Sequence, residues 1–130
     1  MTVELTYLTY AVILLFVHMF VQASFSDLSK GILWAIGPQD EPREQNIVAG
    51  RIQRALTNYV FNLSAFVALA LILKVTELGT EGTALGAAVW FWARVAYVPA
   101  YASGIPFLRT LAWVASLIGI LMMILPLLGY

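Results

Sequence analysis

The chain has 130 residues, of which 62% are apolar and 11% are charged, and its formal net charge is zero. Soluble domains usually carry about 25% charged residues, so this composition, with a mean hydropathy of +0.87, predicts a protein surrounded by lipid. The absence of cysteine excludes disulfides, thiolate metal sites and a protein thiol nucleophile. With His18 as the only histidine, no metal site is expected. Basic runs and tails are absent, so no nucleic acid is expected as a partner.

Long apolar segments separated by polar ones predict an all-α membrane protein. The first of these segments holds no formal charge, and no basic segment typical of a cleaved signal peptide precedes it. Each segment has about the 20 residues that a helix needs to cross a bilayer. We therefore expect one integral membrane domain over residues 1–130, folded as a four-helix bundle with one long polar loop at 26–50. The four spans are expected at about 5–25, 51–73, 83–102 and 107–128.

The positions of the cations predict the orientation in the membrane, because Lys and Arg are retained on the cytoplasmic side. In a four-span topology, the long loop and the turn between the third and fourth spans face the same side. Lys74 lies on the opposite side. We therefore expect the long loop in the cytoplasm and both termini outside. The cations that lie around the loop and the turn are Lys30, Arg43, Arg51, Arg54 and Arg109.

Two of the expected spans carry a polar stripe, because residues three or four apart share one face of a helix. Both stripes lie in the half of the membrane that also receives Arg109. The stripe of the second span comprises Arg51, Arg54, Asn58 and Asn62, and that of the third span comprises Arg94, Tyr97 and Tyr101.

An arginine that faces lipid near the bilayer centre costs roughly 2.5–3.5 kcal/mol, so the stripes are expected to face the bundle interior or a subunit interface. No Asp or Glu lies inside any expected span. The balancing anion is therefore expected to be external, such as a substrate carboxylate, a phosphate or a lipid headgroup, which guanidinium groups bind through paired hydrogen bonds. A second interpretation stays open, above all for Arg51 at the helix mouth: the arginines reach the interface and the tyrosines form an aromatic belt.

These residues also resemble a known family. The segment GRIQRALTNYVFNL, at 50–63, resembles the helix-2 signature R-x-x-R-A-x-x-N-x-x-E of the MAPEG family, the membrane-associated proteins of eicosanoid and glutathione metabolism. Arg94, Tyr97 and Tyr101, followed by Arg109-Thr110, resemble the signature of its helices 3 and 4. The segment WAIGPQDEP, at 34–42, resembles the bacterial branch.

The resemblance implies a homotrimer in a bacterial inner membrane that binds glutathione between neighbouring subunits near the cytoplasmic face. It implies a glutathione transferase or peroxidase acting on a lipophilic electrophile from the bilayer. Arg109 would be catalytic, since the matching arginine of glutathione-using members stabilises the thiolate. A free thiol has a pKa of about 8.5, which a neighbouring guanidinium lowers. The residues expected to bind glutathione are those of the two stripes, of which Arg54, Asn58, Tyr97 and Tyr101 match tripeptide contacts of the family.

The chain departs from the family motif at Phe61, where the motif has a glutamate. In the glutathione-using enzymes that glutamate meets the ammonium group of the tripeptide, whereas an aromatic ring offers a cation–π contact of about 0.5–2 kcal/mol. The alternative is a non-catalytic protein on the same scaffold that binds an anionic lipid or a partner helix. A small multidrug exporter is a third class of this size, but the spans lack the membrane-embedded carboxylate that coupled export usually needs.

Overall fold

Helices alone make up the computed structural model, which describes residues 1–130 and has no strand. The expectation of an all-helical protein is therefore confirmed. A short helix, α2 (Ile32–Ile36), lies between the first two long helices, and a 3₁₀ turn, η1 (Leu125–Leu128), continues the last one. The four long helices are α1 (Val3–Lys30), α3 (Ile47–Thr76), α4 (Glu81–Ser103) and α5 (Leu108–Ile124).

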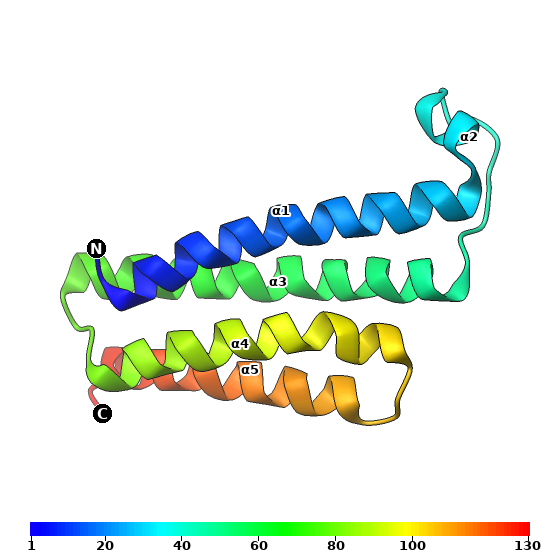
Figure 1. The fold of residues 1–130 in the computed structure, drawn as a ribbon. Helices are drawn as coiled ribbons and strands as arrows, with labels where there is room; N and C mark the ends of the chain where they lie inside the picture. Colours follow the sequence, from blue (N-terminus) through cyan, green and yellow to red (C-terminus); the bar gives the residue numbers. More distant parts are fainter.

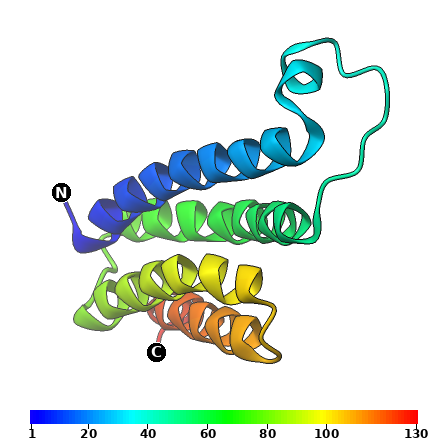
Figure 2. The same cartoon turned by 45° about the vertical axis from the view of Figure 1, so that its right-hand side comes forward.

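The four long helices run side by side, and Figures 1 and 2 show the same arrangement from two directions. α1 pairs with α3, α4 pairs with α5 over the most extensive interface, and α4 also contacts both α1 and α3. The two termini and the α3–α4 connection lie at one end of the molecule. The α1–α3 connection, which includes α2, and the α4–α5 turn lie together at the other end.

Local chemistry determines where the helices begin and end. Helices α1, α3 and α4 each begin after a residue whose side-chain oxygen accepts a hydrogen bond from the first turn, namely Thr2, Asn46 and Thr80. Gly31, with φ of 105°, ends α1 and directs the chain into α2. The polar connection is thus shorter than the expected loop at 26–50, because α1 continues to Lys30 and the Asn46 cap starts α3 early.

The core is built around aromatic residues of α3 and α4. Phe66 stacks on Trp90 with the ring centroids 4.1 Å apart, and both side chains are fully buried. The Tyr59 hydroxyl donates a hydrogen bond to the Ala11 carbonyl oxygen at 2.5 Å, which ties α3 to α1. These contacts hold one face of α3 inside the protein and leave the polar stripe beside it.

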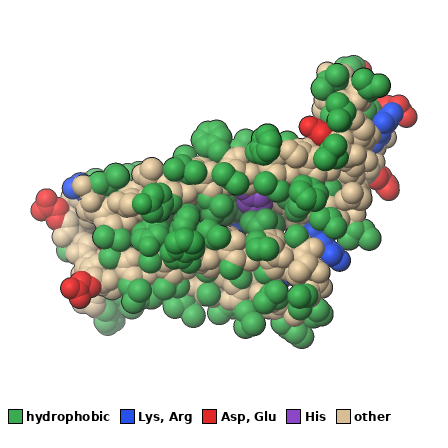
Figure 3. Space-filling model, in the orientation of Figure 1, with side chains coloured by type: hydrophobic (Ala, Val, Ile, Leu, Met, Phe, Trp, Pro, Cys, Tyr) green, Lys and Arg blue, Asp and Glu red, His purple; other side chains and the backbone are tan.

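Three helices are long and apolar enough to cross a membrane: α1, α3, and α5 together with η1. α4 is not one of them, since Arg94, Tyr97 and Tyr101 interrupt its apolar residues. A fourth span at 83–102 therefore stays a prediction. In the space-filling view, hydrophobic side chains cover the middle of the molecule and charged side chains gather toward its ends (Figure 3).

Candidate functional site

The polar stripe of α3 meets α4 and the start of α5 near the α4–α5 turn, with Tyr101 at the centre. Arg54 donates a hydrogen bond from Nε to the Tyr101 hydroxyl at 3.0 Å. Arg109 lies over the same tyrosine, its guanidinium carbon 5.0 Å from the ring centroid. Residues that are distant in the sequence thus place two guanidinium groups on one aromatic side chain.

A third guanidinium is positioned by the end of α4. Arg51 donates a hydrogen bond to the Ala102 carbonyl oxygen at 3.3 Å. Its guanidinium packs on Gly104, where a Cβ atom would come within 2.6 Å of it. Gly104 also has a φ of 70°, in the left-handed region that glycine adopts readily. This glycine therefore both ends α4 and makes room for Arg51.

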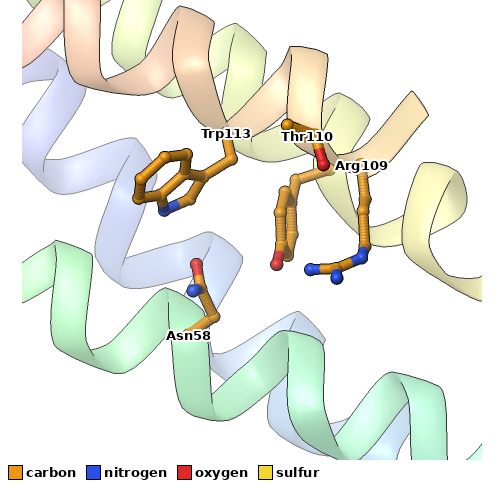
Figure 4. A pocket seen from close by; sticks show the side chains of 5 residues that line it. Asn58, Arg109, Thr110 and Trp113 are labelled. Carbon is orange, nitrogen blue, oxygen red and sulfur yellow. The ribbon is translucent and has the colours of Figure 1, made fainter. Parts of the chain in front are cut away.

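Two cavities adjoin at this point. The first, called here the Asn58 cavity, has a volume of about 350 Å³ and is lined by Asn58, Tyr97, Arg109, Thr110 and Trp113. Figure 4 shows Arg109 and Trp113 pointing from α5 toward Asn58 on α3. The second, the arginine cavity, has a volume of about 360 Å³; its lining includes Arg51, Arg54, Tyr101, Arg109 and Thr110. Arg109 and Thr110 line both cavities, and no acidic side chain lines either one.

The Asn58 cavity also offers a hydrogen-bond acceptor. The Oδ1 atom of Asn58 is buried and has no hydrogen-bond partner, and such an atom costs free energy until a donor reaches it. The two cavities together therefore present three guanidinium groups to an anion, and Asn58, in the wall of one of them, holds an amide oxygen without a donor. This combination suits a guest that carries carboxylates together with an N–H or ammonium group.

The comparison with protein families decides the assignment of the chain. The family model of the MAPEG family matches residues 7–129, which is nearly the whole chain. The chain belongs to the MAPEG family. It is thus a MAPEG protein of the membrane, in agreement with its long apolar helices. The comparison with curated proteins found no match.

Two of the expected site residues of this MAPEG protein lie away from both cavities. Asn62 is half-buried on α3 and lines neither of them. Arg94 is 0% exposed, and none of its three side-chain nitrogens has a hydrogen-bond partner. Its guanidinium carbon lies 4.1 Å from the ring centroid of Tyr97 and 5.6 Å from that of Tyr59.

The geometry of α4 explains the position of Arg94. Arg94 precedes Tyr101 by seven residues, which is about 10 Å along a helix axis. This end of the stripe therefore lies in the protein interior, beyond the cavities. The other expected residues are brought together at the cavities as the spacing predicts. They are Arg51, Arg54, Asn58, Tyr97, Tyr101 and Arg109.

Two residues that line the Asn58 cavity, Thr110 and Trp113, are absent from the set expected from sequence. Trp113 follows Arg109 by four residues, so helical spacing places both on one face of α5. That spacing is the signal in the sequence that could have identified Trp113 as a lining residue. A tryptophan in an apolar membrane segment is, however, also typical of a lipid-facing surface. Phe61, which replaces the motif glutamate, is 74% exposed and lines neither cavity.

Proposed function

We propose that this MAPEG protein is a glutathione-dependent transferase or peroxidase that acts on lipophilic electrophiles. The observation that carries the proposal is the convergence of Arg51, Arg54 and Arg109 at two adjoining cavities without an acidic side chain. Within the proposal, the protein is a homotrimer of four-helix, four-span protomers in a bacterial inner membrane. Its long loop faces the cytoplasm and both termini lie outside.

The chemistry of the cavities supports glutathione as the guest. Glutathione carries two carboxylates, which the guanidinium groups of Arg51 and Arg54 would bind through charge-assisted hydrogen bonds. Its ammonium group would need an acceptor, and the unpartnered Oδ1 of Asn58 is such an atom. This oxygen would take part of the role of the motif glutamate that Phe61 replaces.

The position of Arg109 supports a catalytic role, because it lines both cavities. With glutathione bound, its guanidinium would stabilise the thiolate that remains when the thiol proton passes to solvent. The thiolate sulfur would then attack an electrophilic carbon, so that a sulfur–carbon bond forms and the leaving group departs with its electron pair. Arg54 and Arg109 are exposed in the single protomer, so a neighbouring subunit of the trimer would close the site.

An apolar cavity beside the arginines supports a lipophilic second substrate. It has a volume of about 380 Å³ and lies between α4 and α5, where Pro99, Leu108 and Leu111 are among its lining residues. Ala100 lines both this cavity and the arginine cavity. An electrophile that enters from the bilayer would thus reach the polar site without crossing water.

The first prediction tests catalysis directly. The purified protein in phosphatidylcholine nanodiscs should bind glutathione in calorimetry and conjugate it to chlorodinitrobenzene. Arg109→Ala should lower kcat on the order of 100-fold, as expected for removal of one charge-stabilising donor, and weaken binding less. Arg43→Ala, which removes an arginine of the connecting loop, is the control and should leave both quantities unchanged.

No heat of binding and no conjugation at millimolar glutathione would contradict the proposal. An equal loss of turnover and affinity in Arg109→Ala would instead assign Arg109 to binding alone.

The alternative, a non-catalytic protein that binds an anionic lipid, is favoured by one specific observation. The arginine cavity and the apolar cavity adjoin at Ala100, so together they match a negatively charged headgroup and an acyl chain. The second prediction follows from this alternative: native mass spectrometry should detect a retained anionic lipid that is lost in Arg54→Ala. Retention of the same lipid by the variant would contradict this alternative.

A further inference from the structure

The short helix α2 presents an uncovered apolar face. Ile32, Leu33 and Ile36 are 58%, 86% and 77% exposed, respectively. Ile36 shares a face with Ile32 and with Leu33, because residues three or four apart in a helix are neighbours on its surface, so the three side chains form one surface. Apolar side chains gathered on a protruding element mark a surface that binds a partner or a membrane.

Hydrogen bonds hold this element in a defined shape. Trp34 donates from Nε1 to the Glu41 carbonyl oxygen at 2.6 Å. Arg43 donates from a terminal guanidinium nitrogen to the Lys30 carbonyl oxygen at 2.8 Å. The segment from Gly31 to Arg43 is called here the α2 hairpin. One hydrogen bond within it and one to the end of α1 therefore hold it in place.

The length of α1 gives the depth of the α2 hairpin in the membrane. No charged side chain lies between Glu4 and Asp27, a stretch of roughly 33 Å at about 1.5 Å per residue. The hydrocarbon core of a bilayer is about 30 Å thick, and the headgroup layers bring the total to about 40–45 Å. The hydrocarbon boundary therefore falls near Asp27, and α2, which begins five residues later, lies at the level of the headgroups.

The α2 hairpin also extends in the direction of the surrounding lipid. Gly31 turns the chain away from the α1 axis, and both ribbon views place α2 on the side of α1 that faces away from α3 (Figures 1 and 2). The exposed side chains of Val17, Phe20 and Leu28 lie on one face of α1 at helical spacing. The apolar surface of α2 thus extends the exposed apolar face of α1, which in a membrane helix contacts lipid.

We propose that α2 is an interfacial membrane anchor, which lies in the headgroup layer with Ile32, Leu33 and Ile36 directed toward the acyl chains. Its partner is the bilayer itself. Asp27, Asp40, Glu41 and Glu44 outnumber Lys30 and Arg43 around the α2 hairpin, so the anchor is apolar and has no preference for anionic lipids. The inference does not depend on the proposed enzymatic activity.

The absence of cysteine allows a direct test with a spin label on the full-length protein in phosphatidylcholine vesicles. Leu33→Cys would carry a nitroxide at the centre of the proposed contact. Asp40→Cys, on the exposed polar part of the α2 hairpin, is the aqueous reference. Phe20→Cys and Leu121→Cys, both at exposed apolar positions of long helices, are the lipid references. Electron paramagnetic resonance then compares collisions with oxygen, which concentrates in lipid, and with a water-soluble nickel chelate.

The proposal expects the oxygen-to-nickel collision ratio at position 33 to exceed that at position 40 several-fold and to approach the lipid references. A ratio equal to that at position 40 would overturn it, because the side chain would then face water. Shielding from both reagents would also overturn it, in favour of a protein contact such as a second copy of the chain. Adding phosphatidylserine should leave the ratio unchanged, whereas an increase would contradict the apolar character of the anchor.

Discussion

Arg51 and Gly104 show how one functional side chain depends on one backbone position. The guanidinium of Arg51 occupies the space above Gly104 that any Cβ atom would enter. Gly104 has a φ of 70°, a conformation in which an L side chain costs roughly 1–2 kcal/mol. The backbone conformation thus favours glycine for stability, and the absence of a Cβ atom leaves the space in which the Arg51 guanidinium lies.

The third prediction separates these two effects. Gly104→Ala should lower the free energy of unfolding by about 1–2 kcal/mol through its backbone conformation, measured as a lower thermal midpoint in detergent. The same loss should appear in the Arg51→Ala background, because a flexible guanidinium can move aside at little cost. Gly104→Asn should lose less stability, since asparagine tolerates positive φ better. Disappearance of the loss in the Arg51→Ala background would show that the contact, rather than the backbone, carries the cost.

At the residue scale, helical spacing predicted which side chains the structure brings together, with Arg94 and Asn62 as the exceptions. The spacing of a stripe specifies which face of the helix the residues share. It does not specify how far along the axis the cavity between that face and the neighbouring helix extends. Arg94 therefore shares the stripe of Tyr97 and Tyr101, yet it is enclosed between the rings of Tyr59 and Tyr97. Only the packing of α3 against α4 decides this, and the sequence of either helix alone does not contain it.

At the scale of elements, the most extensive helix interface joins α4 and α5. A Cβ atom on Gly86 would lie 2.7 Å from the Gly119 carbonyl oxygen, and one on Gly119 would lie 2.6 Å from the Gly86 carbonyl oxygen. Small residues allow membrane helices to approach at such distances. The backbones of the two helices are therefore in direct contact where these glycines face each other.

The fourth prediction concerns this contact. Gly86→Ala should destabilise the protein by about 1–3 kcal/mol, because the added methyl group meets backbone atoms that cannot rotate away. Gly82→Ala is the matched control on the same helix, since the nearest atom to its Cβ would be 3.4 Å away. Thermal unfolding in detergent should show a lower midpoint for the first variant and almost no change for the second. Equal midpoints for the two variants would contradict the close packing.

Among the elements, the long apolar helices were predictable from hydropathy, and α2 was not. A helix of five residues is too short to show a periodic pattern, and its apolar residues lie in a region where Gly-Pro and charged residues favour a loop. The observed ends of the helices differ from the expected ends for a related reason. The cap at Asn46 and the turn at Gly31 lie inside the segment whose composition predicts the long loop.

At the scale of the whole molecule, the structure places the α1–α3 connection and the α4–α5 turn at one end, as a four-span arrangement requires. Most cations, including Arg43, Arg51 and Arg109, belong to this end. Arg54 and Arg109 are exposed in the single chain, and an exposed arginine within the membrane is costly without a partner. Within the proposed function, the end that faces the cytoplasm would thus also carry the exposed arginines that a neighbouring subunit would cover.

The fifth prediction tests orientation and assembly together. Asp40→Cys should react with an impermeant maleimide only after the inner membrane is opened, whereas Glu77→Cys, at the opposite end, should react without opening it. Native mass spectrometry of the purified protein should give three copies per particle. Labelling of both positions from outside, or a monomeric particle at all concentrations, would contradict the proposed topology or the homotrimer, respectively.

The close packing of α4 against α5 also has a consequence for the width of the site. α4 and α5 share the most extensive helix interface, so we expect Arg109 and Trp113 on α5 to keep their distance from Tyr97 on α4. Asn58 belongs to α3, on the other side of the Asn58 cavity. We therefore expect the cavity to change its width where α3 meets this pair, so that a molecule held by Asn58 and Arg109 together would join α3 to α5.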